Sequence, residues 1–250
     1  MTRIEHVVAA TLAASGFVAA GCSDDPSSDR VLVLAASSLT EAFSAMETEV
    51  EAANPGVDVE LSFGGSSTLR VQVEQGAPAA VVAFADSAPM IALEEADLVD
   101  DPVRFATNSI VLATPIDDPG SVDELADLSD PDRLVGICAA QVPCGRYAHD
   151  VFERAGLDAS VDTEEPDVRA LVGKLVAGEL DAGLVYATDV RAMPDRLREV
   201  ALPSGVEVRA EYPIAVVTDT ADRLAAERFV EFVASPAGQA VMADAGFGSP

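Results

Sequence analysis

Short apolar runs alternate with helical patterns through most of this 250-residue chain. Apolar runs bounded by turn signals are typical of buried strands, and the segments that follow them here mostly have helical spacing. This order predicts an α/β fold in which helices flank a mostly parallel sheet. The expected strands are 31–36, 57–63, 80–84, 110–113, 134–137, 182–186, 206–209 and 214–217, and the expected helices are 39–53, 69–75, 90–96, 145–155, 168–177, 221–234 and 237–245.

The clearest turn from strand to helix is V-L-V-L-A-A-S-S-L-T-E-A-F, residues 31–43. Ser38 and Glu41 fit a capping box, in which Ser38 would hold a free backbone N–H group and Glu41 would reach back. The same turn would also point the unpaired N–H groups of the helix beyond the sheet edge, with the Ser38 hydroxyl as an additional donor to an anion. Both interpretations of Ser38, helix cap and ligand donor, stay open on this stretch alone.

A second turn of this kind follows the next strand, at G-G-S-S-T, residues 64–68. Its glycines let the backbone approach a ligand, and Ser66 can donate its hydroxyl proton. The segment is neither a P-loop nor a dinucleotide fingerprint, so it is a weak signal by itself. Turns that follow parallel strands share one sheet edge, and Ser38 and Ser66 could therefore converge on one anion.

The second half of the chain offers three further candidates. Cys144 precedes a predicted helix, and Val168 opens another, so the backbone N–H groups of both are available. Asp167 is expected to be the N-cap of the second of these helices. Tyr186 ends an apolar strand and could place its hydroxyl in a site, or be an aromatic residue at the core boundary.

The net charge of −28 excludes two classes of partner. Nucleic acid and anionic lipid surfaces both require basic patches. An anionic ligand would have to be held by neutral dipoles and hydrogen bonds against this overall charge. Accordingly, the only lysine, Lys174, is expected in solvent, and Arg146 is expected to point away from the site.

Residues 1–21 are predicted to be a signal peptide, because Arg3 precedes an apolar run at 7–20 that is too short to anchor the chain in a membrane. The run ends in V-A-A-G-C, which resembles a bacterial lipobox and would make Cys22 a lipidated N-terminus. Ala19 stands where leucine is more usual, and cleavage nearby without lipid stays open. Residues 22–29 are polar and are expected to form a flexible tether.

Two cysteines remain after Cys22, in C-A-A-Q-V-P-C. Outside the cytoplasm neighbouring thiols tend to pair, so we expect a disulfide between Cys138 and Cys144. A metal site would need further ligands, and His149 is the only histidine beyond the signal segment. A redox pair would more often read C-x-x-C, but neither alternative is eliminated.

Seven segments together resemble the molybdate-binding proteins of bacterial ABC transporters, in the same order and across residues 30–246. They are A-A-S-S-L-T-E-A-F, F-G-G-S-S-T-L, N-S-I-V-L-A-T-P, V-P-C-G-R-Y-A, D-V-R-A-L-V, G-E-L-D-A-G-L-V-Y-A-T-D and Y-P-I-A-V-V. Two positions depart from the family pattern: Cys144 stands where alanine is usual, and Ala80 where aspartate is usual.

The resemblance implies a type II periplasmic-binding-protein-like fold, with two hinged lobes that close on molybdate or tungstate. Each lobe would be a mixed, mostly parallel sheet flanked by helices. The implied division is 30–107 for lobe 1, 108–218 for lobe 2 and 219–250 for the return to lobe 1.

The implied oxyanion contacts are five groups, with no cofactor and no direct metal ligand. They are the hydroxyls of Ser38, Ser66 and Tyr186 and the backbone N–H groups of Cys144 and Val168. A bridge from Cys138 to the Cys144 side chain would leave the Cys144 N–H group free for the ligand.

The expected function is that of an extracytoplasmic, lipid-anchored monomer that binds molybdate, and tungstate, and delivers it to the membrane permease of an ABC importer. A binding protein for another oxyanion or a small acid is the alternative, and a sensor role also stays open. A secreted serine hydrolase would need Ser38 or Ser66 to pair with His149, and the chain has no G-x-S-x-G elbow.

Overall fold

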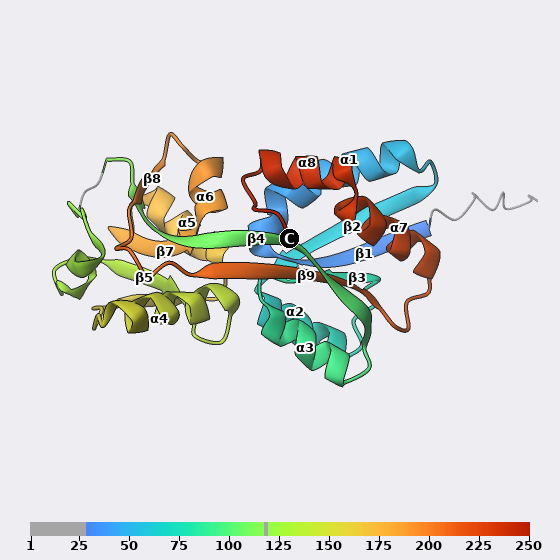
Figure 1. Ribbon diagram of the computed structural model, residues 1–250, viewed down its shortest axis with the longest axis horizontal. Helices are drawn as coiled ribbons and strands as arrows, with labels where there is room; N and C mark the ends of the chain where they lie inside the picture. Colours follow the sequence, from blue (N-terminus) through green and yellow to red (C-terminus); the bar gives the residue numbers. More distant parts are fainter. Residues whose placement is uncertain (1–28, 118–119) are drawn as a thin grey trace, which may run out of the picture.

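The computed structural model describes residues 29–117 and 120–250 (Figure 1). The predicted signal peptide, Cys22 and the predicted tether up to residue 28 lie outside this range. Within it, every helix is too short or too polar to cross a bilayer.

The described residues form nine strands and eight α-helices, which mostly alternate in sequence. The strands are β1 (Asp29–Ala36), β2 (Val57–Gly64), β3 (Val81–Ala83), β4 (Val99–Pro115), β5 (Val135–Cys138), β6 (Thr163–Glu165), β7 (Ala182–Tyr186), β8 (Leu197–Val200) and β9 (Arg209–Val217). The helices are α1 (Thr40–Ala53), α2 (Ser66–Glu74), α3 (Ser87–Glu95), α4 (Pro143–Ala155), α5 (Val168–Ala177), α6 (Ala187–Ala192), α7 (Arg223–Ala234) and α8 (Pro236–Asp244). Two 3-10 helices, η1 (Ser37–Leu39) and η2 (Leu125–Ser129), complete the elements.

The strands are ordered β2-β1-β3-β9-β4-β7-β5-β6, and β8 also pairs with β4. Strand β1 is parallel to β2 and β3, and β5 is parallel to β6 and β7. Every antiparallel pair contains β4 or β9. These two long strands run side by side through the middle of the molecule and connect two lobes (Figure 1). The fold is therefore the mixed, two-lobed α/β arrangement that was predicted.

In the first lobe, strands β1–β3 lie between two layers of helices (Figure 1). Successive side chains of a strand point to opposite faces of the sheet. Val31, Val33 and Ala35 of β1 therefore belong to the core cluster that includes the apolar faces of α1 and α7. Leu34 points the other way, to a smaller cluster under α2 and α3. Because both faces are covered, β1 is apolar from Val31 to Ala36 and ends in a buried turn.

In the second lobe, α4 covers one face of β5 and β7, while α5 and α6 cover the other (Figure 1). Val151 and Phe152 of α4 and Leu171 and Leu175 of α5 are buried in the same core cluster. Both lobes consequently direct the beginnings of helices toward the region between them.

The structure corrects several predicted elements. The strand expected at 206–209 is absent; Val206 and Val208 are buried but unstranded, and only Arg209 belongs to β9. The alternation of apolar and polar residues in this segment therefore reflects the burial of the two valine side chains and not membership of a strand. The strand expected at 110–113 is the end of the much longer β4, and β6 and β8 were not predicted.

The boundaries of the lobes at 107 and 218 remain predictions. The pairing of Ile214–Val216 with β3 nevertheless places this part of β9 beside the strands of the first lobe, before residue 218.

Candidate functional site

The five residues predicted to contact a ligand all line one cavity between the lobes. In this closed arrangement the volume open to the centre of a water-sized sphere is about 10 Å³. Besides Ser38, Ser66, Cys144, Val168 and Tyr186, its walls include Ala36, Ser37, Gly64, Gly65, Ala85, Val142, Pro143 and Asp167. The cavity is thus bounded by helix beginnings from both lobes and by the end of β7.

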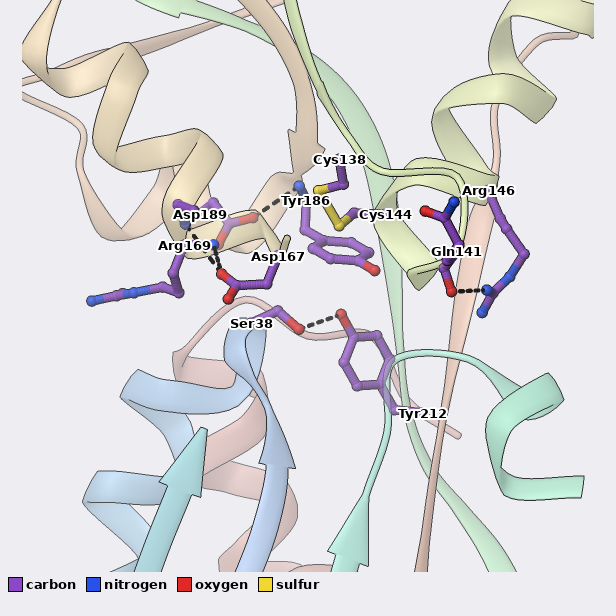
Figure 2. The surroundings of a disulfide bond; sticks show 11 residues. Ser38, Cys138, Gln141, Cys144, Arg146, Asp167, Arg169, Tyr186, Asp189 and Tyr212 are labelled. Atoms are coloured by element: carbon purple, nitrogen blue, oxygen red, sulfur yellow. Dashed lines mark hydrogen bonds between the residues drawn. A yellow bond between two sulfur atoms is a disulfide. The ribbon is translucent and has the colours of Figure 1, made fainter. Parts of the chain in front are cut away.

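Ser38 reaches the cavity from the 3-10 turn that joins β1 to α1. Its side chain is buried, and its Oγ lies 2.9 Å from the hydroxyl of Tyr212 (Figure 2). The predicted capping box is wrong, because neither η1 nor α1 has a side-chain cap. Ser38 bonds to Tyr212 instead, and Glu41 forms an ion pair with Arg169.

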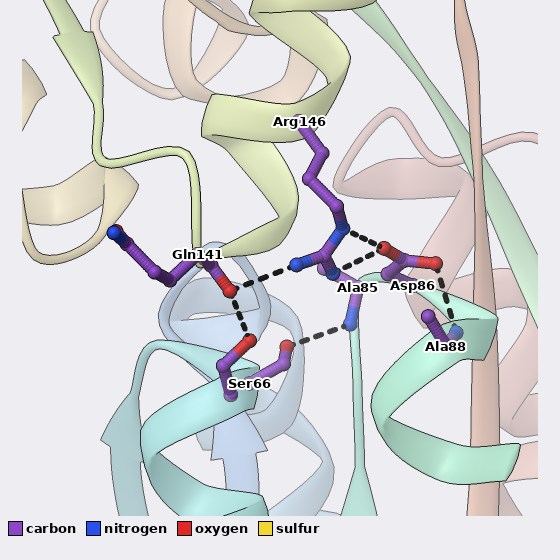
Figure 3. Close-up of polar contacts among 7 residues, drawn as sticks. Ser66, Ala85, Asp86, Ala88, Gln141 and Arg146 are labelled. Atoms are coloured by element: carbon purple, nitrogen blue, oxygen red, sulfur yellow. Dashed lines mark hydrogen bonds and ion pairs between the residues drawn. The ribbon is translucent and has the colours of Figure 1, made fainter. Parts of the chain in front are cut away.

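Ser66 is the first residue of α2, which begins three residues earlier than predicted. Its Oγ accepts a hydrogen bond of 3.1 Å from the backbone N–H of Ala85 (Figure 3). A hydroxyl that accepts one bond can still donate its own proton. Ser66 can therefore act as a donor to a ligand while it is held in place by Ala85.

The second lobe contributes the beginnings of α4 and α5. Cys144 is the second residue of α4, and Val168 is the first residue of α5. The first N–H groups of a helix have no partner within the helix, and they form its positive end. Asp167 caps α5 as predicted, since its Oδ1 accepts from the N–H groups of Arg169 and Ala170 at 2.8 and 3.1 Å.

A disulfide joins Cys138 at the end of β5 to Cys144 in α4, as predicted (Figure 2). The bridge stiffens the loop that forms one wall of the cavity, and it engages the side chain of Cys144 rather than its backbone N–H group. Gly145 follows directly, and a Cβ atom there would lie 2.0 Å from the carbonyl oxygen of Ala139. Only glycine fits at this close approach of loop and helix.

Tyr186 lies on the other lobe from Ser38 (Figure 2), and it lines the cavity together with Ser38 and Ser66. Its side chain is 1% exposed, and its hydroxyl has no hydrogen-bond partner among the described residues. Burial raises the pKa of the Tyr186 hydroxyl well above its ordinary value, so the group stays protonated and can donate. An unpaired buried hydroxyl costs about 1–3 kcal/mol, which an acceptor in the cavity would offset.

An ion pair joins the two lobes outside the cavity. Arg146 of α4 bonds to Asp86, the N-cap of α3 in the first lobe, with an Nε–Oδ2 distance of 2.8 Å (Figure 3). Its Nη1 also donates to the carbonyl oxygen of Gln141 at 2.8 Å, and Ser67 of the first lobe donates to the same oxygen. Arg146 does not line the cavity, so its expected separation from the ligand site holds, but it points to the other lobe rather than to solvent.

Gly65 shows how closely the lobes approach. A Cβ atom at Gly65 would lie 2.8 Å from the carbonyl oxygen of Pro166 and 3.1 Å from Cγ1 of Val142, both in the second lobe. On the far side, Arg169 of α5 pairs with Glu41 of α1. The structure therefore has the lobes in a closed arrangement.

The cavity contains no basic side chain from the described part of the chain. Lys174, expected in solvent, instead donates to Glu165 and to Thr163. Within residues 29–117 and 120–250, no cluster of three or more His, Cys, Asp or Glu is arranged to hold a metal ion. His149 is exposed on α4 and does not line the cavity, so it is not placed to activate either serine.

Two polar residues next to the site were not singled out from the sequence. Tyr212 of β9 bonds to Ser38, and Asn108 of β4 donates to Thr188 at 2.9 Å and to Tyr212 at 3.5 Å. A buried polar side chain needs a hydrogen-bond partner. The position of Tyr212 and Asn108 just before predicted apolar strands was therefore the one indication in the sequence that they have buried partners. The partners come from distant segments, so the sequence could not identify them.

A larger hollow, with about 670 Å³ open to the centre of a water-sized sphere, lies at the opposite end of the first lobe. Its charged lining consists of Asp219, Asp222 and an ion pair between Arg30 and Glu60, and Gly76 lies just beyond the carboxyl end of α2. Carboxylates and a helix carboxyl terminus repel anions. This hollow is therefore a poor anion site, despite its size.

Comparison with known proteins places the chain in a family. Residues 31–248 match the model of the family described as bacterial extracellular solute-binding protein. The molybdate-binding protein ModA of Mycobacterium tuberculosis is 35% identical over 98% of this chain and 97% of its own length. ModA of Haemophilus influenzae is 30% identical over 88% of this chain and 90% of its own length.

A solved structure confirms the fold class. The periplasmic molybdate-binding protein of Azotobacter vinelandii superposes with a TM-score of 0.79 at 21% identity, covering 88% of this chain and 99% of that protein. The chain thus belongs to the family of bacterial extracellular solute-binding proteins, and it is a binding protein that acts outside the cytoplasm, not an enzyme.

Proposed function

We propose that this protein is the solute-binding component of an ABC importer and that it carries molybdate, or tungstate, between its two lobes. The 30–35% identity to ModA proteins over most of the chain supports this assignment. The observation that carries it is the buried Tyr186 hydroxyl, which has no hydrogen-bond partner in the described part of the chain and lies in a cavity that Ser38 and Ser66 line from the other lobe.

In this proposal the oxyanion accepts hydrogen bonds from Ser38, Ser66 and Tyr186 and from the N–H groups of Cys144 and Val168. A tetrahedral dianion accepts at four oxygens, and charge-assisted hydrogen bonds are the stronger kind. The positive ends of α2, α4 and α5 add to this attraction without a basic side chain. Selection among oxyanions would follow cavity size, because a smaller anion leaves buried donors unpaired.

Binding would couple to closure of the lobes. A ligand that touches donors of both lobes favours the closed form by its greater affinity for that form. We propose that the closed surface docks on a membrane permease and that the protein acts as a monomer. Lipidation of Cys22 would hold it at the membrane, and mass spectrometry of the mature N-terminus tests this part separately.

Isothermal titration of the wild-type protein with molybdate, tungstate, sulfate and hydrogen phosphate tests the ligand. We expect heat and 1:1 binding with molybdate and tungstate, and much weaker binding of the other two. Ser38→Ala and Tyr186→Phe should each weaken binding by about tenfold or more, since each loses a hydrogen bond to a charged acceptor. Ser44→Ala, on the exposed face of α1, is the matched control. No heat with any of the four anions would refute the assignment.

A further inference from the structure

A buried chain of hydrogen bonds runs from the cavity through both strands that connect the lobes. Ser38 Oγ lies 2.9 Å from the Tyr212 hydroxyl, which lies 3.5 Å from Asn108 Nδ2, which donates to Thr188 Oγ1 at 2.9 Å. All four side chains are buried. Tyr212 belongs to β9, Asn108 to β4 and Thr188 to α6, so the chain begins in the first lobe and ends in the second.

The direction of these hydrogen bonds follows from one backbone group. The N–H of Ser109 donates to Asn108 Oδ1 at 2.9 Å, and a backbone N–H can only donate. The Asn108 amide is thereby fixed with its NH₂ group toward Tyr212 and Thr188. An amide nitrogen does not accept hydrogen bonds, so the Tyr212 oxygen accepts from Asn108.

The Tyr212 hydroxyl has one proton, and it has accepted a hydrogen bond on its Asn108 side. Distance alone allows either hydroxyl to donate in the pair with Ser38, but Ser38 Oγ is the other hydrogen-bond partner that the described residues give Tyr212. We therefore assign the Tyr212 proton to this bond, with Ser38 Oγ as its acceptor. The proton of Ser38 itself is then left for the cavity. Burial raises the pKa of the Tyr212 hydroxyl, and this keeps the proton on Tyr212.

The other two hydroxyls that are proposed to contact the ligand, those of Ser66 and Tyr186, are also free to donate, each for a separate reason. Ser66 Oγ accepts from the N–H of Ala85, and the Tyr186 hydroxyl has no partner within the described chain. All three hydroxyls can thus donate at once, which suits a guest that only accepts hydrogen bonds.

We propose that Tyr212 and Asn108 are positioning residues that fix Ser38 as a hydrogen-bond donor to the oxyanion. Neither residue lines the cavity, so each acts through Ser38 and not by direct contact. The inference rests on the proposed oxyanion-binding function, which it deepens by naming what orients one of the ligand groups.

A double-mutant cycle measured by isothermal titration with molybdate tests this role. Tyr212→Phe keeps the ring in its contacts with Phe105 and Phe247 and removes only the hydroxyl. It should weaken binding by about tenfold, the usual effect of one hydrogen bond. In the Ser38→Ala background the same change should have no further effect, because the hydroxyl it orients is gone.

Two additional variants complete the test. Tyr147→Phe alters the remaining tyrosine, which does not line the cavity, and should leave the affinity unchanged. Asn108→Ala removes the group that sets the direction; it should weaken binding by a few fold, again only when Ser38 is present. Thermal unfolding without ligand shows whether each variant is folded. If Tyr212→Phe does not fold, the double-mutant cycle is measured with Asn108→Ala in its place.

The outcomes distinguish failure of the positioning role from failure of the proposed oxyanion-binding function. If Tyr212→Phe weakens binding equally with and without Ser38, its effect is general and the positioning role is overturned. Unchanged affinity in both Tyr212→Phe and Asn108→Ala overturns it as well. Failure of the wild-type protein to bind any oxyanion overturns the proposed function and this inference together.

Discussion

Replacing Gly65 by alanine should weaken ligand binding by about tenfold to a hundredfold while leaving the ligand-free fold nearly intact. The added Cβ would lie 2.8 Å from Pro166 O, whereas ordinary contact begins at 3.4 Å. The lobes would have to separate by ~0.6 Å at this point, which stretches a hydrogen bond of ordinary length to the limit of the interaction. Because Gly65 precedes Ser66 in the cavity wall, two or three ligand contacts would weaken together.

The backbone at Gly65 presents no obstacle to alanine. Its φ of −66° and ψ of 130° are ordinary values for any residue. Gly65 is the N-cap of α2, where alanine costs about 1 kcal/mol at most against glycine. A loss of affinity would therefore report the closure of the lobes rather than unfolding.

Titration with molybdate gives the affinity, and small-angle X-ray scattering with and without molybdate shows whether the lobes still close. Gly173→Ala is the matched control, because a Cβ there meets nothing within 4 Å and alanine suits the interior of α5. It should leave the affinity unchanged and raise the stability slightly. Wild-type affinity in Gly65→Ala would show that ligand binding does not require this closed arrangement.

Three further predictions concern groups near the cavity. Asp86→Asn removes the ion pair with Arg146 and should weaken molybdate binding by about two- to fivefold at low salt, with a smaller difference at high salt; an effect independent of salt would contradict this. Changing both Cys138 and Cys144 to serine should lower the free energy of unfolding in urea by ~2 kcal/mol through the lost loop constraint, and an unchanged midpoint would contradict this. Burial raises the pKa of Asp189 to about 7 from an ordinary value of 3.8. Between these values the folded protein holds a proton that the unfolded chain has released, so the free energy of unfolding should fall as pH rises through this window. Asp189→Asn should reduce that fall in urea titrations, and an identical pH profile in the variant would refute the assignment.

The elements that could be predicted are those whose signals are local. Strand β1 and helix α5 follow from an apolar run and from Asp167 followed by helical spacing. Strand β4 was missed over most of its length because its first half contains charged residues and Pro102, and its pairing with β9 shifts register twice. Apolar and polar residues do not alternate regularly in such a strand, because backbone pairing with neighbouring strands stabilises it rather than the burial of one face.

The site shows the same limit. Helix beginnings suggested Ser38, Ser66 and the N–H groups of Cys144 and Val168, and a strand end suggested Tyr186. The resemblance to a transport family then implied that these five groups form one ligand set. The capping interpretation of Ser38 was wrong because Tyr212, far along the chain, supplies its buried partner. The contact of Arg146 with Asp86 forms between the closed lobes, and the contact of Tyr212 with Asn108 forms between the two strands that connect them. Residue spacing along the chain contains no information about these.

The central claim is that neutral donors from both lobes enclose one tetrahedral oxyanion. Crystals grown with tungstate, measured at the tungsten absorption edge, would locate the metal directly by its anomalous scattering. We predict a single strong peak within hydrogen-bonding reach, through its oxygens, of the Ser38, Ser66 and Tyr186 hydroxyls. A peak elsewhere, or an empty cavity at saturating tungstate, would contradict the account.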